Sequence, residues 1–130
     1  MLSTSNRLTS PVHFREVVRR GRRRGGDLLV LHLLAMPSPV AHGPAAAGPR
    51  VGFVVSKAVG PAVTRNLVKR RLRHLARERL SSLPEGSMLV VRALPAAASA
   101  TYDALARELD RSLAQVTVAR KHPEKAVISR

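Results

Sequence analysis

Cysteine and tryptophan are absent from this chain, and aromatic side chains make up only 2% of it. Without cysteine, the chain can form neither a disulfide nor a thiolate metal site. The aromatic rings, on Phe14, Phe53 and Tyr102, are too few for a sheet surface that recognises RNA by stacking bases on exposed aromatics. Any recognition of nucleic acid should therefore rely on phosphates, whose contacts do not depend on base sequence.

Long apolar segments are also missing. The longest run, from Leu28 to Met36, is interrupted by His32 and has about half of the roughly 18 residues that a membrane-spanning helix needs. The N-terminal sequence, MLSTSNRLTS, contains no apolar stretch of the kind found in signal peptides. These absences predict a cytoplasmic protein without a membrane partner.

Residues that could carry chemistry are scattered along the chain. No two histidines have a metal-ligand spacing, and we expect Glu108 and Asp110 to point to different faces of a solvated helix. Nothing supports a glycine-rich phosphate loop or a Ser-His-Asp triad. The sequence therefore predicts no metal site from protein side chains alone, no protein catalytic residues and no small-molecule substrate.

Positive charge is what the chain has in excess. Its 23 Lys and Arg residues outnumber 8 Asp and Glu, for a formal net charge of +15. Up to Arg77 there are 15 basic and 2 acidic residues, a net of +13, whereas the remainder has 8 and 6, a net of +2. A field of one sign over half of a small domain is typical of proteins that bind nucleic acid or an anionic membrane.

The charge is densest in a predicted helix over residues 64–77, TRNLVKRRLRHLAR. At about 100° per residue, its apolar Val68, Leu72 and Leu75 lie on one side. The other side, within about 140°, forms what we call the basic stripe: Arg65, Asn66, Lys69, Arg70, Arg73 and Arg77. Because like charges repel, we expect a polyanionic partner here, and a merely solvated face is the alternative.

The remaining pattern predicts a single α+β domain over residues 10–118, between a mobile basic arm (1–9) and a disordered basic tail (119–130). Ser10 and Pro11 begin a first helix, and Thr101 caps a last one. Strands are expected at 27–35, 50–56 and 88–94, with the basic helix running to about residue 80. The segment GRRRGG (21–26) is a basic turn or a short edge strand, and residues 37–49 form a flexible loop.

Several motifs resemble the protein subunit of bacterial ribonuclease P. The most specific is the strand end RVGFVVSK (50–57), followed by Gly60 and by R-N-x-x-K-R-x-x-R from Arg65 to Arg73. The resemblance covers most of residues 6–118. Further matching positions are Asn6-Arg7-Leu8, Phe14, Arg92, Pro95 and Tyr102.

The resemblance implies a two-layer α-β-β-β-α-β-α sandwich with a four-stranded, ribosomal-protein-like sheet, whose fourth strand would come from GRRRGG. It also implies a left-handed crossover around the basic helix, against the usual rule. In that family the protein is one subunit of a ribonucleoprotein endonuclease, a hydrolase of tRNA processing. A catalytic RNA with bound Mg²⁺ removes the 5′ leader of precursor tRNA. The resemblance therefore implies catalytic RNA and precursor tRNA as partners, and Mg²⁺, bound mainly by the RNA, as cofactor.

Most site residues follow from the same resemblance. It implies RNA binding by Lys57 and by Arg65, Asn66, Lys69, Arg70 and Arg73 of the basic stripe, and Arg77 is added from its place on the same helix face. Phe14, Val18 and His32 are expected to line a cleft for the leader. From their charge alone, Arg22, Arg23 and Arg24 are further candidates for RNA contact, with solubilising surface as the alternative.

Some positions depart from the family pattern. Leu67 stands where the family often has Arg, and Arg71 stands where an apolar residue is common. Val18 and His32 occupy positions that are often aromatic, so the cleft should stack less and rely more on charge. For Phe14 and His32, a plain core position is the alternative.

Two other interpretations of the charge remain open. A structural RNA-binding protein of the ribosomal type would carry a similar excess of Lys and Arg, and the RNA that co-purifies would separate the two. An anionic-membrane binder would use a basic amphipathic helix, but the apolar Val68, Leu72 and Leu75 are needed for the core.

Overall fold

A computed structural model of the chain describes residues 6–34, 48–84 and 86–121. Its helices are α1 (Pro11–Arg20), α3 (Ala62–Glu78) and α4 (Tyr102–Lys121), and its strands are β1 (Arg22–Gly25), β2 (Leu29–Leu34), β3 (Arg50–Val54) and β4 (Met88–Ala93). Short 3₁₀ turns are η2 (Lys57–Val59), η3 (Leu80–Ser82) and η4 (Pro95–Ser99). The element order is the predicted one. In the described part of the chain, no helix is both long and apolar enough to cross a membrane.

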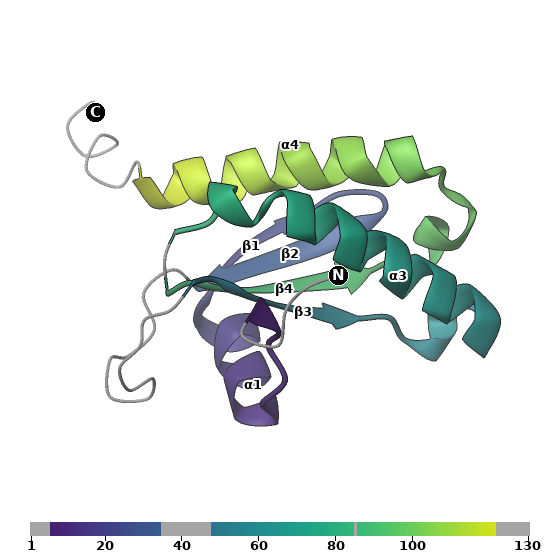
Figure 1. Cartoon of the computed structure of the whole chain (residues 1–130), viewed down its shortest axis with the longest axis horizontal. Helices are drawn as coiled ribbons and strands as arrows, with labels where there is room; N and C mark the ends of the chain where they lie inside the picture. Colours follow the sequence, from purple (N-terminus) through teal and green to yellow (C-terminus); the bar gives the residue numbers. More distant parts are fainter. Residues whose placement is uncertain (1–5, 35–47, 85, 122–130) are drawn as a thin grey trace.

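The strands form one mixed sheet in the order β1-β2-β4-β3 (Figure 1). The pairs β1–β2 and β2–β4 are antiparallel, whereas β3 and β4 are parallel. Parallel neighbours cannot be joined by a hairpin, so the chain crosses over through α3 between them. This arrangement confirms the predicted α+β fold with a four-stranded sheet.

Capping side chains set the starts of two helices. The Ser10 Oγ accepts a hydrogen bond from the backbone N–H of His13 (3.4 Å), and Pro11 occupies the first turn of α1. The Thr101 Oγ1 accepts one from the N–H of Ala104 (3.0 Å) at the start of α4. Both caps satisfy helix donors that have no partner within the helix, and both were predicted.

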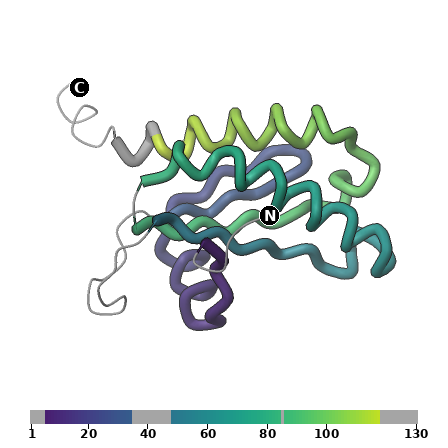
Figure 2. The backbone as a smooth tube through the Cα atoms, viewed as in Figure 1, coloured from purple at the N-terminus to yellow at the C-terminus, as the bar shows by residue number. Residues whose placement is uncertain are grey.

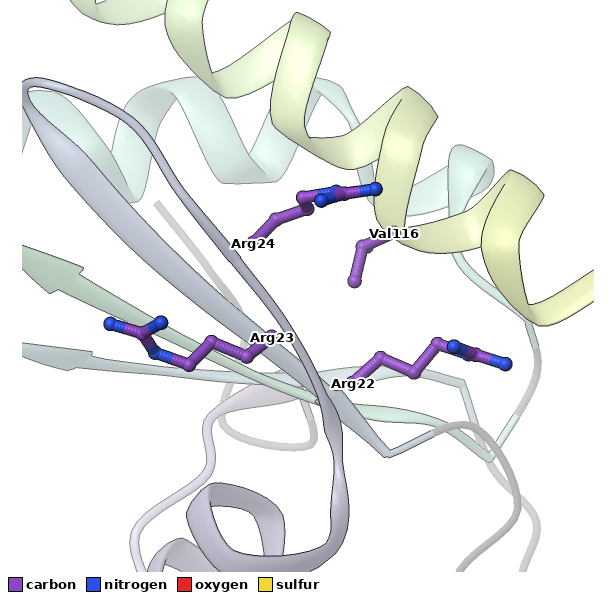
Figure 3. A pocket seen from close by; sticks show the side chains of 4 residues that line it. All are labelled: Arg22, Arg23, Arg24 and Val116. Carbon is purple, nitrogen blue, oxygen red and sulfur yellow. The ribbon is translucent and has the colours of Figure 1, made fainter.

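The segment GRRRGG resolves into strand β1 at one edge of the sheet. Arg23 pairs with His32, and Arg24 pairs with Leu31, so neighbouring arginines point to opposite faces. Arg22 and Arg24 extend toward α4, whereas Arg23 extends away from it (Figure 3). The edge-strand alternative for this segment is therefore the correct one.

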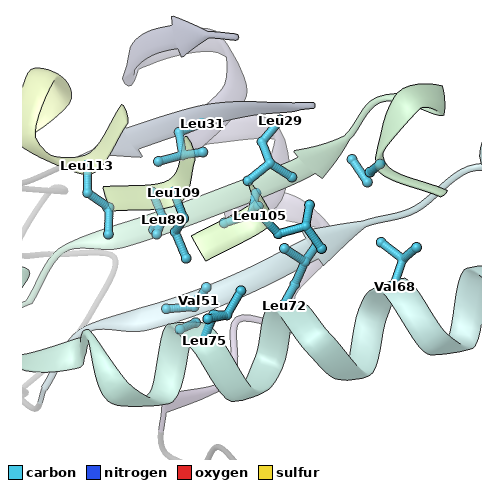
Figure 4. Packing of buried hydrophobic residues seen from close by; sticks show 14 of the residues in the cluster. Leu29, Leu31, Val51, Val68, Leu72, Leu75, Leu89, Leu105, Leu109 and Leu113 are labelled. Atoms are coloured by element: carbon cyan, nitrogen blue, oxygen red, sulfur yellow. The ribbon is translucent and has the colours of Figure 1, made fainter. Parts of the chain in front are cut away.

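The main core lies between the sheet and the pair α3 and α4 (Figure 4). From α3 it receives Val68, Leu72 and Leu75, each at most 1% exposed. These three are the residues predicted for the inner face of the basic helix. The other labelled members in Figure 4 come from β2, β3, β4 and α4: Leu29, Leu31, Val51, Leu89, Leu105, Leu109 and Leu113.

Helix α1 lies on the opposite side of the sheet from α4 (Figures 1 and 2). Its Val17 packs there against Met88 and Val90 of β4, in a second and smaller core. Leu8, only 4% exposed, belongs to this core, and its N–H donates to the Val51 carbonyl (3.0 Å). The arm predicted over residues 1–9 is therefore attached to the domain at residues 6–9, because Leu8 buries its apolar side chain.

Three predicted segments need adjustment or fall outside the described residues. Helix α4 continues to Lys121, three residues into the predicted tail (119–130). Residues 122–130, 1–5 and most of the predicted loop (37–49) lie outside the part that the structure describes.

Glu108 corrects the expectation of a fully solvated last helix. Its side chain is buried, and its Oε2 accepts hydrogen bonds from the backbone N–H groups of Leu28 (2.8 Å) and Leu29 (2.7 Å). Leu28 lies in the turn that leads into β2, and Leu29 is the first residue of that strand. The carboxylate thus fixes α4 to the β1–β2 turn.

Candidate nucleic-acid interface

The start of α3 depends on a glycine. Gly60 has φ of +152°, and a Cβ there would come within 3.2 Å of Thr64 side-chain atoms. Glycine relieves both constraints and lets Pro61 lead into the helix. The Nε of Arg65 donates back to the Gly60 carbonyl (3.0 Å), which holds this guanidinium at the positive end of α3. The terminal nitrogens of Arg65 remain as further donors.

The basic stripe lies along the outside of α3, as predicted. Asn66, Arg70 and Arg77 are exposed, whereas Arg65, Lys69 and Arg73 are half-buried. Within the described residues, none of these six takes part in an ion pair. The stripe therefore presents uncompensated positive charge to solvent.

Arg71 lies outside the stripe and has a structural contact. Its Nη1 donates to the carbonyl of Ala100 (3.2 Å), in the segment that leads into α4. This bond explains how an arginine is accommodated at this position of α3.

A pocket of about 300 Å³ lies where α1, β3 and α3 meet. Phe14 contributes an aromatic ring, and Lys69 and Arg73 contribute two positive charges from the basic stripe. The remaining lining residues are Arg7, Leu8, Thr9, Val51, Gly52 and Phe53. The pocket thus combines surfaces suited to a nucleobase and to phosphate groups.

The position of the Phe14 ring depends on Gly52. A Cβ at residue 52 would clash with the ring of Phe14, and the nearest ring atoms are Cζ, Cε2 and Cε1. Only glycine lets the ring lie this close to the backbone of β3. The motif R-V-G-F therefore shapes the floor of the pocket.

Other predicted site residues lie outside this pocket. Lys57 is exposed in η2, and Val18 is 38% exposed on α1. His32 lies on the α1 face of the sheet but is only 5% exposed, and its Nδ1 is buried without a hydrogen-bond partner. Burial, followed by the positive charges of Arg23 and Arg92, lowers the pKa of His32 below 6.5. Of the three predicted cleft residues, only Phe14 lines the pocket.

Arg22, Arg23 and Arg24 lie at the sheet edge farthest from β3. They are therefore separate from the pocket and from the basic stripe.

Sequence reasoning missed Arg7, Thr9 and Phe53 as lining residues. Asn6-Arg7-Leu8 was among the positions that resemble the family, so the sequence did point to Arg7. Only the β-bridge between Arg7 and Val51 shows that this segment lies beside β3. Asn6 supports the same contact by donating from Nδ2 to the Pro49 carbonyl (2.8 Å).

The residues at this interface do not fit a protein-bound magnesium site. Mg²⁺ prefers carboxylate oxygens and water, whereas the stripe offers guanidinium, ammonium and one amide. Among the described residues, no group of three or more His, Asp or Glu could hold a metal ion.

Comparison with known proteins decides the family. The family model described as Ribonuclease P matches residues 2–117. The chain belongs to the ribonuclease P protein family. Among curated members, the ribonuclease P protein component of Nocardioides sp. is 60% identical over 116 residues, covering 89% of this chain and 95% of that protein. That of Streptomyces bikiniensis is 58% identical over 114 residues, covering 87% and 93%.

Solved ribonuclease P proteins share the fold. The protein from Staphylococcus aureus superposes with a TM-score of 0.70 at 24% identity, covering 85% of this chain and 96% of that one. The protein from Thermotoga maritima gives 0.69 at 20% identity, covering 85% and 96%. Ribonuclease P is a ribonucleoprotein endoribonuclease of tRNA processing, so this family member is an RNA-binding subunit with an RNA partner.

Proposed function

We propose that this chain binds the catalytic RNA of ribonuclease P through the basic stripe and holds the 5′ leader of precursor tRNA in the Phe14 pocket. In this way it assists the removal of the leader. The observation that carries the proposal is the pocket itself, where Phe14, Lys69 and Arg73 come from two helices on opposite sides of β3. An aromatic ring beside two cations suits a single strand, whose bases stack and whose phosphates are anionic.

The exposure of the side chains on α3 indicates which of them would bind the catalytic RNA and which would bind the leader. Asn66, Arg70 and Arg77 are exposed on the outside of α3 and can reach the backbone of a large folded RNA. Lys69 and Arg73 are half-buried and line the pocket, where a flexible single strand fits. Phosphate contacts of this kind place an RNA without reading its sequence.

Catalysis is assigned to the RNA. The described acidic residue that is deeply buried, Glu108, is bonded to backbone N–H groups far from the basic stripe. The pocket is lined by cationic, aromatic and aliphatic side chains with one threonine, and by no carboxylate or histidine, so its side chains would bind and orient the leader. Mg²⁺ would be held mainly by the RNA, since the protein interface offers it no carboxylate ligands.

Reconstitution tests the proposal. Purified protein alone should not cleave precursor tRNA, and addition of the ribonuclease P RNA from the same organism should give cleavage at low magnesium. The RNA alone is the matched control and should need more magnesium, because the stripe's positive charge is then missing. Metal-dependent cleavage by the RNA-free protein, lost when an acidic residue is changed to Ala, would contradict RNA catalysis. Co-purification of ribosomal RNA in place of the ribonuclease P RNA would favour the ribosomal-type alternative.

A further inference from the structure

A second concentration of positive charge lies at the β1 edge of the sheet. We call it the β1 corner, and it consists of Arg19, Arg20, Arg22, Arg23 and Arg24. All five are exposed. Within the described residues, only Arg20 has an acidic partner, Glu16 at 3.4 Å. Arg19 and Arg20 occupy the last turn of α1, where the helix dipole favours cations.

The geometry of β1 places its three arginines around a hollow in the protein surface. Arg22, Arg23, Arg24 and Val116 line a hollow of about 170 Å³ between β1 and α4 (Figure 3). Arg22 and Arg24 extend along the α4 side, and Arg23 extends to the other face. Guanidinium groups spaced along a rigid strand can each form paired hydrogen bonds to a phosphate.

Apart from Glu16, which pairs with Arg20, the nearby acidic groups do not pair with the corner. Glu108, beside the β1–β2 turn, uses Oε2 for the backbone of Leu28 and Leu29, and its Oε1 lies 3.6 Å from Arg111. Asp27 is exposed in that turn and forms no ion pair with an arginine of the corner. Among the described residues, the other four arginines of the corner therefore have no acidic partner.

The corner is well separated from the basic stripe. In the sheet order, β2 and β4 lie between β1 and β3, which places the two edges about 14 Å apart at the usual strand spacing. Helix α3 packs against β3, at the other edge of the sheet from β1. The basic stripe and the β1 corner therefore lie at different edges of the sheet.

Protection of a free strand edge is the simplest alternative, because charged residues on edge strands discourage sheet-to-sheet pairing. One charge on β1 would serve that purpose. Here three consecutive arginines place charge on both faces of the strand, and two more adjoin it at the end of α1. This excess points to a ligand with several phosphates.

We propose that the β1 corner binds the phosphate backbone of the catalytic RNA, at a segment distinct from the one bound by the basic stripe. The proposal rests on the proposed function of the stripe as an RNA-binding face. The protein would then hold two parts of one folded RNA at opposite edges of its sheet. The 5′ leader of precursor tRNA would bind separately, in the pocket lined by Phe14, Lys69 and Arg73.

Directed hydroxyl-radical probing tests this geometry directly. Because the chain has no cysteine, the single variants Arg24→Cys, Arg70→Cys and Arg107→Cys each provide one attachment point for an iron chelate. In a complex with the ribonuclease P RNA alone, positions 24 and 70 should cleave two different sets of nucleotides. Position 107, exposed on α4, is the control.

The outcomes separate the two proposals. Cleavage from position 70 but not from 24, or equal weak cleavage from 24 and 107, would overturn the β1 corner while leaving the stripe intact. Absence of cleavage from position 70 would count against the proposed function itself. Cleavage from position 24 that appears only after precursor tRNA is added would assign the corner to the substrate and overturn the proposal.

The salt dependence of RNA binding provides a second test of the β1 corner. The double variant Arg22→Ala and Arg24→Ala should bind the RNA more weakly and flatten the slope of log K against log salt by about 1.4–1.8, if each arginine contacts one phosphate. Arg107→Ala should leave the slope unchanged. Combination with Arg70→Ala should add the two changes, because separate sites act independently. An unchanged slope in the double variant would show that these arginines do not contact RNA phosphates and only protect the strand edge.

Discussion

The ring of Phe14 on α1 lies against the backbone of Gly52 on β3, so closely that residue 52 has no room for a Cβ. This contact joins a helix on one side of the sheet to an outer strand and forms the floor of the pocket beside Lys69 and Arg73. A change at Gly52 can therefore move the ring that is proposed to contact the leader.

Gly52→Ala should displace the Phe14 ring and weaken binding of precursor tRNA by the reconstituted enzyme. The added methyl group meets the far end of a side chain that can rotate away, so the fold should persist. Loss of one stacked base costs about 1–3 kcal/mol. Equilibrium binding of substrates with and without a leader measures the effect, which should be confined to the substrate with a leader.

Gly25→Ala is the matched control for this change, because a Cβ there makes only an ordinary contact of 3.7 Å with Val30. Equal binding by the Gly52→Ala variant and the unchanged protein would show that Phe14 does not contact the leader.

Arg70→Ala should weaken binding of the ribonuclease P RNA without loss of fold, since Arg70 is exposed. Removal of one phosphate contact should flatten the salt slope by about 0.7–0.9. Leu72→Ala, two residues along the same helix, changes a fully buried side chain and should cost about 2–5 kcal/mol of unfolding free energy. RNA binding at several salt concentrations and urea unfolding distinguish the two effects, and an unchanged slope for Arg70→Ala would argue against a phosphate contact.

Glu108→Ala should destabilise the domain, because two backbone donors at the β1–β2 turn lose their acceptor. Each lost hydrogen bond to a charged group is worth about 1.5–3 kcal/mol. Glu108→Gln keeps an acceptor oxygen and should cost less. Urea unfolding measures both, with the exposed Glu78→Ala as control; similar midpoints for Glu108→Ala and Glu78→Ala would contradict this role.

His32 should make stability depend on pH. Its folded pKa lies below 6.5 because of burial and of the positive charges of Arg23 and Arg92. As the pH falls through 6.5, the unfolded chain takes up a proton that the folded chain still excludes. The free energy of unfolding should therefore fall, by at most about 1.4 kcal/mol per pH unit, until the folded pKa is reached.

His32→Leu removes the titratable imidazole and places an apolar side chain at this buried position. Urea unfolding at pH 7.5, 6.5 and 5.5 should show a smaller loss of stability for the variant than for the unchanged protein. Parallel pH curves would show that His32 is not excluded from protonation in the fold.

Helix and strand positions were largely predictable because they follow from local repeats. The spacing of Val68, Leu72 and Leu75 fixed the inner face of α3, and Ser10 and Thr101 marked two helix starts. The segment from Arg22 to Gly25 could not be assigned from its sequence, since a strand of exposed arginines has no apolar alternation. Only its pairing with β2 makes it a strand.

The candidate site was predicted in part. The basic stripe follows from helical periodicity, and its orientation away from the core is confirmed. Phe14, Val18 and His32 were expected together in one cleft, yet only Phe14 lines the pocket. Whether Val18 and His32 contact the leader stays a prediction.

By itself, the sequence determined the net charge, the basic stripe and the apolar faces that form the core, because composition and periodicity are local properties. The tertiary structure alone decided that Phe14 meets Gly52, that Arg7 adjoins Val51 and that Glu108 holds a turn 80 positions away. Such contacts depend on how distant segments pack and on which backbone groups are left without partners. No pattern within either segment encodes that outcome.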